Sequence, residues 1–458
     1  MSLTSSLSIA LQSMLANQGG LSVTSNNIAN VNTPGYSREV ANFEESPPET
    51  FDGLQFGTGV SLHSITAVRD NVLQLRLNQE AQNQGKLDTF TTGMNQVQPL
   101  FNEPAGAGLQ NLISQFFSSF QQLSADPTNS GLRQSVISDA QSLTAGFNQT
   151  ASALQTQQTS ADQGVVQTVG QINQLTTQIA ALNTQISAPS ASDQASNALV
   201  DQRNLLVNQL SQLVDVQSIT ADNTGLTLTT SAGTPLVVGG QTFQLTTQAN
   251  PATGFQDIFA QGKDITSSIT GGNLAGDLQL RDHELPSLEN SLDTLANGIA
   301  TSVNTQQAAG FDLNGAHGTN IFVPPAALKG SALNLAVAIT DPNKIAASAD
   351  GTQGNNANAT ALANLQNQNI ISGQTPISYY SGLVFQVGND TANATSNLSA
   401  ENLLIQQLQD QQNAVSGVSL DQEGANLVQF QNAYNAAAKV ASIVATLFQT
   451  AINMDPVT

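Results

Sequence analysis

Cysteine, tryptophan and charge are what this sequence has least of. The 458-residue chain contains no Cys and no Trp, and charged residues make up only 9% of it. Without Cys there is no disulfide, no thiolate metal ligand and no cysteine nucleophile. Lys and Arg number 11 against 32 Asp and Glu, for a net charge of −21. This balance argues against nucleic-acid binding, which needs a basic surface.

Targeting signals are also missing from the sequence pattern. No apolar run approaches the ~20 residues of a membrane span, so membrane insertion is not expected. The first ten residues have no basic residue, and Ser and Thr interrupt their apolar positions. We therefore expect a cytoplasmic protein, or export by a route that reads no cleaved signal.

Hydrophobic residues and amides are present in quantity. Hydrophobic residues make up 39% of the chain, too many for a disordered acidic protein, and the length suits two to four domains. Asn and Gln together form about a fifth of the sequence, a composition with few charges to repel neighbouring copies. The first charged residue is Arg38, and residues 424–454 contain only Lys439. Both ends are therefore nearly uncharged.

Apolar residues at the N-terminus follow a 4-3 spacing that predicts a heptad helix. The expected interface residues on this helix are Leu3, Leu7, Ala10, Met14, Leu21 and Ile28. Gly19 and Gly20 interrupt the pattern, at about 1 kcal/mol each relative to Ala. Pro34 and Gly35 predict that the helix ends in a turn over residues 30–35.

The C-terminal segment has a similar pattern. Its expected interface residues are Leu427, Phe430, Tyr434, Ala437, Ala441, Val444 and Phe448. A second stripe runs through Val440, Ile443 and Leu447. Two apolar faces on one helix indicate burial against more than one neighbour.

The middle of the chain is predicted to be mainly helical with a β-rich insertion. Apolar spacing predicts helices over 69–100, 109–124, 131–155, 165–186, 199–213, 284–308 and 396–412. Residues 214–275 alternate apolar and polar residues between Gly and Pro turns, which predicts antiparallel strands, and residues 51–66 are expected to form a short hairpin.

No pattern in the sequence indicates an active site, a metal site or a cofactor site. The three His residues lie in different segments, and neither a P-loop nor a nucleophile elbow is present. Asp282 and Glu284 lie near the start of a predicted helix, where acids act as caps far more often than as catalysts. We therefore expect no enzyme.

The terminal stripes have two readings. Such stripes more often form an intramolecular core than an interface between copies. Their position at the chain ends, and outer faces of Ser, Thr, Asn, Gln and Ala rather than charge pairs, favour burial by other copies.

Two segments carry a family resemblance. Residues 25–38, SNNIANVNTPGYSR, closely resemble the N-terminal signature of bacterial flagellar rod, hook and hook-associated axial proteins. Residues 416–423, SGVSLDQE, with the helix that follows, look like the C-terminal signature of the same family. The resemblance assigns the signature turn to Asn26, Asn27, Ala29, Asn30, Asn32, Thr33, Pro34, Gly35 and Tyr36.

Two internal stretches narrow the resemblance to the members that form the hook–filament junction. Residues 198–206, ALVDQRNLL, and residues 304–312, NTQQAAGFD, are similar to internal segments of those members. Well-known members carry a further outer domain between the regions matching 310–311 and 339–341. Only about thirty residues occupy that interval here, so one outer domain fewer is expected.

The resemblance implies a fold and a set of partners. The expected domains are an inner coiled-coil domain from 1–50 and 399–458, a helical middle domain from 51–213 and 276–398, and a small outer β domain over 214–275. The implied partners are other copies of the chain, hook protein, a second junction protein, the flagellin filament, an export chaperone at the C-terminal helix and the flagellar type III export apparatus. The implied location is the extracellular flagellum, at the junction of hook and filament.

Two other classes remain open at this point. A surface adhesin or phage-fibre-like structural protein would also use coiled-coil ends and a β insertion. A hydrolase hidden in the insertion would have to use Asp222, Asp257 and Asp264, which lack a His or Glu partner there.

Overall fold

The computed structural model describes residues 3–51, 53–101, 108–188, 193–221 and 225–453. The chain divides into two compact units, described separately below. The first unit comprises Met1–Gln82, Ile172–Leu245 and Asn402–Thr458, and the second comprises Asn83–Gln171 and Thr246–Glu401. Three long helices have residues in both units: α2 (Asn71–Phe101), α4 (Ser130–Ile186) and α9 (Pro376–Ser416).

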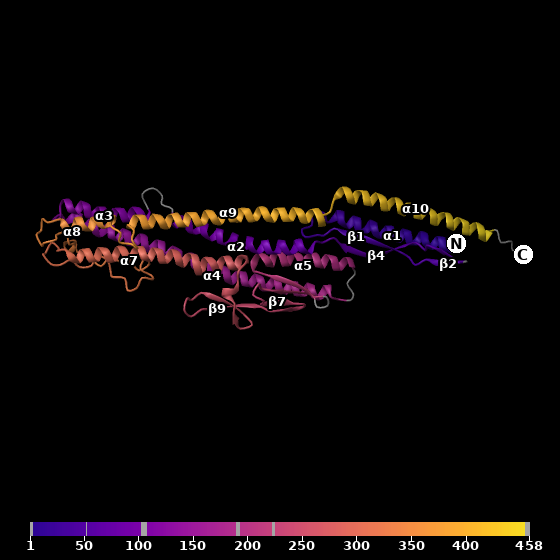
Figure 1. The fold of residues 1–458 in the computed structure, drawn as a ribbon, viewed down its shortest axis with the longest axis horizontal. Coiled ribbons are helices and arrows are strands. Elements are labelled where there is room, and N and C mark those ends of the chain that lie inside the picture. Colours follow the sequence, from indigo (N-terminus) through magenta and orange to yellow (C-terminus); the bar gives the residue numbers. More distant parts are fainter. Residues whose placement is uncertain (1–2, 52, 102–107, 189–192, 222–224, 454–458) are drawn as a thin grey trace. The chain divides into compact units, whose positions relative to one another are not determined.

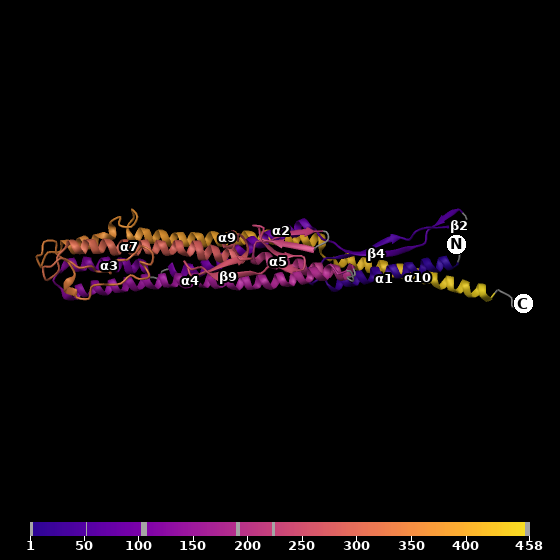
Figure 2. The ribbon, with the colours of Figure 1, turned by 90° about the horizontal axis from the view of Figure 1, so that it is seen from below.

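The first unit pairs the two ends of the chain. Its own helices are α1 (Leu3–Ala29), α5 (Asp193–Leu213) and α10 (Leu420–Asn453). α1 and α10 lie side by side and run in opposite directions (Figures 1 and 2). The paired terminal helices expected from the sequence are therefore present.

Two small sheets and a hairpin complete the first unit. β1 (Glu39–Glu45) and β4 (Val60–Ala67) form an antiparallel ribbon that packs on α1, with β2 (Glu49–Phe51) and β3 (Leu54–Phe56) as a hairpin between them (Figure 2). A four-stranded sheet has the order β5-β6-β7-β8, with antiparallel neighbours. Its strands are β5 (Gln217–Ala221), β6 (Gly225–Thr229), β7 (Pro235–Val238) and β8 (Gln241–Thr242).

The second unit contains the main hydrophobic core. Its complete helices are α3 (Leu109–Ala125), α6 (Gly272–Gln279), α7 (Leu285–Ala309) and α8 (Ala357–Asn364), with a π-helix at Leu280–Glu284. Phe116 lies at the centre of this core, where its ring packs against those of Phe117, Phe120 and Phe322. A three-stranded sheet has the order β11-β10-β9. Its strands are β9 (Leu245–Ala249), β10 (Gln256–Ala260) and β11 (Lys263–Asp264).

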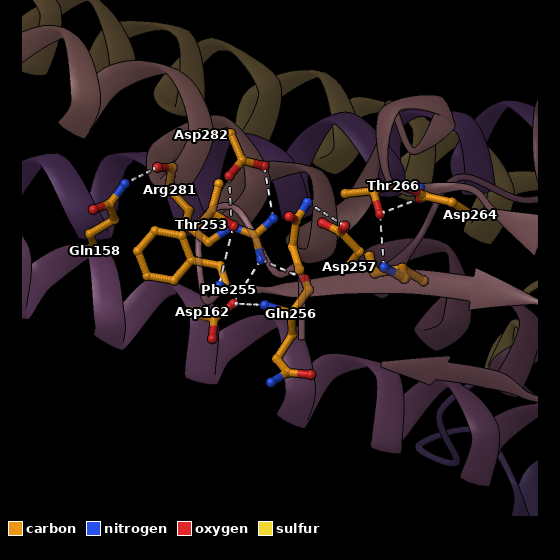
Figure 3. A network of polar contacts seen from close by, with 12 residues as sticks. Gln158, Asp162, Thr253, Phe255, Gln256, Asp257, Asp264, Thr266, Arg281 and Asp282 are labelled. Carbon is orange, nitrogen blue, oxygen red and sulfur yellow. Dashed lines mark hydrogen bonds and ion pairs between the residues drawn. The ribbon is translucent and has the colours of Figure 1, made fainter. Parts of the chain in front are cut away.

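A buried arginine ties the π-helix to α4 and β10. The Arg281 side chain donates to Asp162 on α4, to the carbonyl of Gln256 and to Asp282 (Figure 3). The backbone carbonyl of Arg281 accepts from Gln158, also on α4. Arg281 is 1% exposed, so its charge is held by two carboxylates rather than by water.

The fold class predicted from the sequence is confirmed: the chain is mainly helical with small antiparallel sheets. Two details differ. The helices predicted over 131–155 and 165–186 are one continuous helix, α4, because the polar stretch between them contains no Pro. Glu284 occupies the N-cap position of α7 but makes no side-chain cap hydrogen bond, and Asp282 lies within the π-helix, where it pairs with Arg281. The four-part domain division remains a prediction.

Candidate functional site

The α1–α10 pair is built on a close approach at Gly20. A Cβ atom on Gly20 would lie 2.9 Å from the ring of Phe430 on α10. A Cβ on Gly19 would lie 2.7 Å from Cδ2 of Leu62 on β4. The two glycines therefore let α1 sit closely between a helix and the ribbon, which offsets their poor helix propensity.

The predicted interface residues lie where α1 and α10 meet or at the edge of that contact. On α1, Ala10 is buried and Leu7 is exposed, and four residues are half-buried: Leu3, Met14, Leu21 and Ile28. On α10, Ala437 and Val444 are buried, and five residues are half-buried: Leu427, Phe430, Tyr434, Ala441 and Phe448. The structure thus brings both predicted stripes together within one chain. Their role between copies remains a prediction.

A second apolar row on each helix stays uncovered in the single chain. Val440, Ile443 and Leu447 on α10 are 48–55% exposed, and Leu11 and Leu15 on α1 are 54% and 58% exposed. By length and composition, the stretch Pro376–Asn453 contains a window apolar enough to cross a membrane, although only 11% of that window is buried. This window is not an unbroken apolar run, because polar residues interrupt it; the many Ala residues of α10 raise its mean hydropathy.

Asn27 connects the end of α1 to the start of β1. Its side chain is 1% exposed and makes hydrogen bonds in both directions with the backbone of Glu39. Nδ2 donates to the Glu39 carbonyl, and Oδ1 accepts from the Glu39 N–H, both at 2.9 Å. The Tyr36 hydroxyl also donates to Oδ1, at 2.8 Å. The amide thus makes the two hydrogen bonds that a neighbouring strand would make to Glu39, and it fixes the direction in which the chain leaves α1.

The other signature residues form the turn that Asn27 closes. Asn30 donates to both oxygens of Asn26, and its own Oδ1 accepts from the Thr33 hydroxyl. Pro34 and Gly35 follow, and Gly35 has φ +78°, a conformation that favours Gly. The predicted helix end at this turn is confirmed, since α1 ends at Ala29. Ala29 and Asn32 are exposed at its surface.

Asp201 on α5 anchors the segment that follows the turn. Its carboxylate accepts from the backbone N–H and hydroxyl of Ser37, each at 2.8 Å, and forms an ion pair with Arg69 at 2.8 Å. Sequence reasoning did not assign this role to Asp201, Ser37 or Arg69. A usable signal was present, because Asp201 is one of few charges and lies in the internal motif 198–206.

Burial shifts the acid–base properties of two groups at this corner. Burial raises the pKa of Tyr36 well above its usual value, and nearby Glu39, Asp201 and Glu423 add to the shift. Burial also lowers the pKa of Arg203, and Arg69 adds to this effect. Tyr36 is therefore a permanent hydrogen-bond donor to Asn27 at physiological pH.

A polar cleft of about 430 Å³ opens beside the turn. Residues 30–37 form one wall, and residues from α5, the start of α2 and the end of α9 form the others. Side-chain amides dominate the lining outside the turn: Gln74, Asn204, Asn208, Gln409, Gln412 and Asn413. Among the described residues, no group of three or more His, Asp or Glu is placed to hold a metal ion.

Comparison with known proteins identifies the family of this chain. The model of the flagellar hook-associated protein FlgK helical domain matches residues 94–322, half of the chain. The chain belongs to the flagellar hook-associated protein FlgK family. A second model, flagella basal body rod protein, matches residues 7–36, which contain most of α1 and the signature turn.

Relatives of the family align over almost the whole chain. Flagellar hook-associated protein 1 of Bacillus subtilis is 28% identical over 496 residues, covering 98% of this chain and 97% of the relative. The Escherichia coli protein of the same name is 26% identical over 547 residues, covering 99% and 100%. The flagellar hook junction protein FlgK of Burkholderia pseudomallei shares the fold, with a TM-score of 0.68 at 20% identity over 74% of this chain and 100% of that one.

Membership of the FlgK family defines the class of function. The chain is a structural protein of the extracellular bacterial flagellum that assembles with other flagellar subunits, and it is not an enzyme. The adhesin, phage-fibre and hydrolase readings are therefore set aside. Asp257 and Asp264 serve as hydrogen-bond acceptors for Asn250 and Thr266, and Asp222 lies outside the described residues.

Proposed function

We propose that this protein forms the junction zone between the flagellar hook and the flagellin filament. It assembles as a ring at the distal end of the hook, with hook protein on one side and a second junction protein and the filament on the other. The carrying observation is the pair of uncovered apolar rows on α1 and α10. Burying a large aliphatic side chain is worth about 1.5–3 kcal/mol, so several per subunit stabilise an inner tube of neighbouring copies.

The proposed division of labour follows the chain. Residues 1–50 and 399–458 form the inner coiled-coil domain, and the predicted interface residues on α1 and α10 make its contacts between copies. Residues 51–213 and 276–398 form the helical middle domain, and residues 214–275 the outer β domain. The signature turn directs the chain from the inner tube into the middle domain, supported by the fixed geometry of Asn27 and Glu39.

The proposed route to the flagellum is the flagellar type III export apparatus. The chain passes through this apparatus unfolded. Before export, a chaperone binds the chain and covers the apolar face of α10. The absence of charge from residues 1–37 and the uncovered row at Val440, Ile443 and Leu447 support this role for a chaperone.

Electron microscopy of a strain lacking this gene tests the junction role. We expect hooks without filaments and flagellin shed into the medium, both reversed by the intact gene. Normal filaments in the deletion strain would contradict the proposal.

Substituting Pro34 or Gly35 should impair assembly more than it impairs folding of residues 70–400. Equal damage to assembly and to folding would contradict the role of the turn.

A further inference from the structure

Lys439 is the one cation in an otherwise uncharged helical surface. It is the only Asp, Glu, Lys or Arg between residues 424 and 454, and its side chain is exposed. Within the described residues Lys439 makes no ion pair. It borders the uncovered apolar row at Val440, Ile443 and Leu447.

Helix geometry places Lys439 on the side of α10 that faces away from α1. Ala437 and Val444 are buried on the α1 side. Lys439 is two residues after Ala437, a rotation of about 200° at 3.6 residues per turn. Lys439 therefore faces the surface that the single chain leaves uncovered, where another molecule can supply an acidic partner.

Exposed acidic side chains gather on the β1–β4 ribbon and on the β2–β3 hairpin between its strands. Glu44 and Glu45 lie on β1 and Glu49 lies on β2. All three are exposed; Glu45 and Glu49 make no ion pair among the described residues, and Glu44 pairs with His63. Leu54 on β3 is 64% exposed nearby, and Phe43, whose ring packs against Phe430 of the same chain, is still 39% exposed. The ribbon thus offers negative charge beside apolar surface, the complement of the Lys439 side of α10.

The two surfaces lie at the same height along the terminal pair. Gly20 on α1 faces Phe430 on α10, and the two helices run in opposite directions. Lys439 lies about 14 Å beyond Phe430 along α10, at 1.5 Å per residue, so it is level with residue 11 of α1. On the ribbon, the Ser46 hydroxyl donates to Gln12 Oε1, and Gly59 lies against Ile9. Glu45 therefore also lies near the level of residues 9–12, and a lateral neighbour with little axial shift brings it opposite Lys439.

We propose that the exposed side of α10 in one copy binds the β1–β4 ribbon and the β2–β3 hairpin of the adjacent copy, with Lys439 paired to the acidic group Glu44, Glu45 and Glu49. This inference rests on the proposed assembly of the chain into a ring and adds its lateral contact. The apolar row supplies most of the binding, and the ion pair sets the register, since charge complementarity specifies alignment more than affinity.

Cysteine crosslinking in isolated flagella tests the contact, because the chain has no Cys of its own. We expect Lys439→Cys combined with Glu44→Cys, Glu45→Cys or Glu49→Cys to give disulfide-linked multimers under oxidation. Gln431→Cys, exposed on α10 about 12 Å from Lys439, is the matched control with the same acidic-site partners and should give none.

Three crosslinking results would overturn the inference. The first is that no Lys439 pair gives multimers although the variants are incorporated into flagella. The second is a fast-migrating monomer, which would mean that the disulfide forms within one chain. The third is that Lys439→Cys alone gives multimers, which would place α10 of one copy against α10 of another. Absence of all variants and of the wild type from flagella would instead contradict the proposed function.

Charge reversal gives an independent measurement. Lys439→Glu and Glu45→Lys should each lower the number of subunits per flagellum, by up to about fivefold for an exposed pair, and the double variant should recover most of the loss. Lys439→Gln should have a smaller effect than Lys439→Glu. If the double variant lost as many subunits per flagellum as the two single variants lose together, a direct pairing would be contradicted.

Discussion

At the scale of single residues, side-chain amides do much of the work that charge does in other proteins. Asn27 replaces a strand neighbour for Glu39, and Asn183 donates to the carbonyls of Leu226 and Gly239 beneath the four-stranded sheet. An amide both donates and accepts, so it satisfies buried backbone without adding charge. The high amide content of the sequence therefore has a structural use inside the subunit as well as on its surface.

Replacing Asn27 by Ala should destabilise the corner between α1 and β1. The change removes both hydrogen bonds that the Asn27 side chain makes with the backbone of Glu39, each worth about 0.5–1.5 kcal/mol. Chemical denaturation measures the loss. Asn32→Ala, at an exposed site in the same turn, is the control and should change stability by less than about 0.5 kcal/mol.

Asp277 should make the stability of the protein depend on pH. Burial raises the pKa of Asp277 from 3.8 to about 7, against an opposing effect of Arg281. Between about pH 4 and 7 the folded protein therefore holds a proton that the unfolded chain has lost, and the free energy of unfolding falls as pH rises.

The variant Asp277→Asn isolates this contribution. It should be more stable than the wild type at pH 8 and should flatten the pH dependence between pH 5 and 8, measured by urea denaturation. The neutral amide carries no desolvated charge, which is the physical reason. An unchanged pH slope in the variant would show that Asp277 ionises normally.

At the scale of elements, the glycines in helices separate two kinds of position. Gly20 lies against Phe430, whereas Gly170 on α4 is exposed and has nothing within 4 Å of an added Cβ. Ala is the better helix former at both, by about 1 kcal/mol. At Gly20 the close contact with Phe430 outweighs this gain, so replacing Gly20 by Ala should destabilise the protein.

Gly20→Ala and Gly170→Ala should therefore act in opposite directions. Gly170→Ala should stabilise the protein by up to about 1 kcal/mol. Gly20→Ala should push α10 away from α1 and speed hydrogen exchange of residues 8–24, measured by mass spectrometry. Slower exchange in both variants would mean that helix propensity, not the contact with Phe430, determines the result.

The sequence predicted the periodic elements well and the non-local contacts poorly. The end of α1, the C-terminal helix and the antiparallel strands between residues 214 and 275 all followed from spacing and turn residues. The bond from Asp201 to Ser37 spans 164 positions, and no local pattern encodes it. The π-helix at Leu280–Glu284 was also missed, because its buried Arg281 depends on Asp162, far away in the chain.

At the scale of the whole molecule, the ends should be the least stable part of the free subunit. α10 has only two buried apolar residues, Ala437 and Val444, whereas α7 is buried along its length. Local stability follows buried apolar contact, so α1 and α10 should open far more often than α7.

Limited proteolysis of the free subunit and of isolated flagella compares the two states. We expect cleavage within α10 in the free subunit, protection of the same sites in flagella and slow cleavage of α7 in both. Ends that resist the protease in the free subunit would contradict assembly-dependent ordering.

The pairing of α1 with α10 also sets the order in which the subunit is completed. These helices lie nearly four hundred positions apart in the chain, and a contact between such distant segments closes late in folding. Because synthesis begins at the N-terminus, α1 has to wait for the last segment of the chain before its partner exists. A chain cut short anywhere before Leu420 leaves α1 with the β1–β4 ribbon but without its helical partner, so formation of the pair reports that α10 has been made.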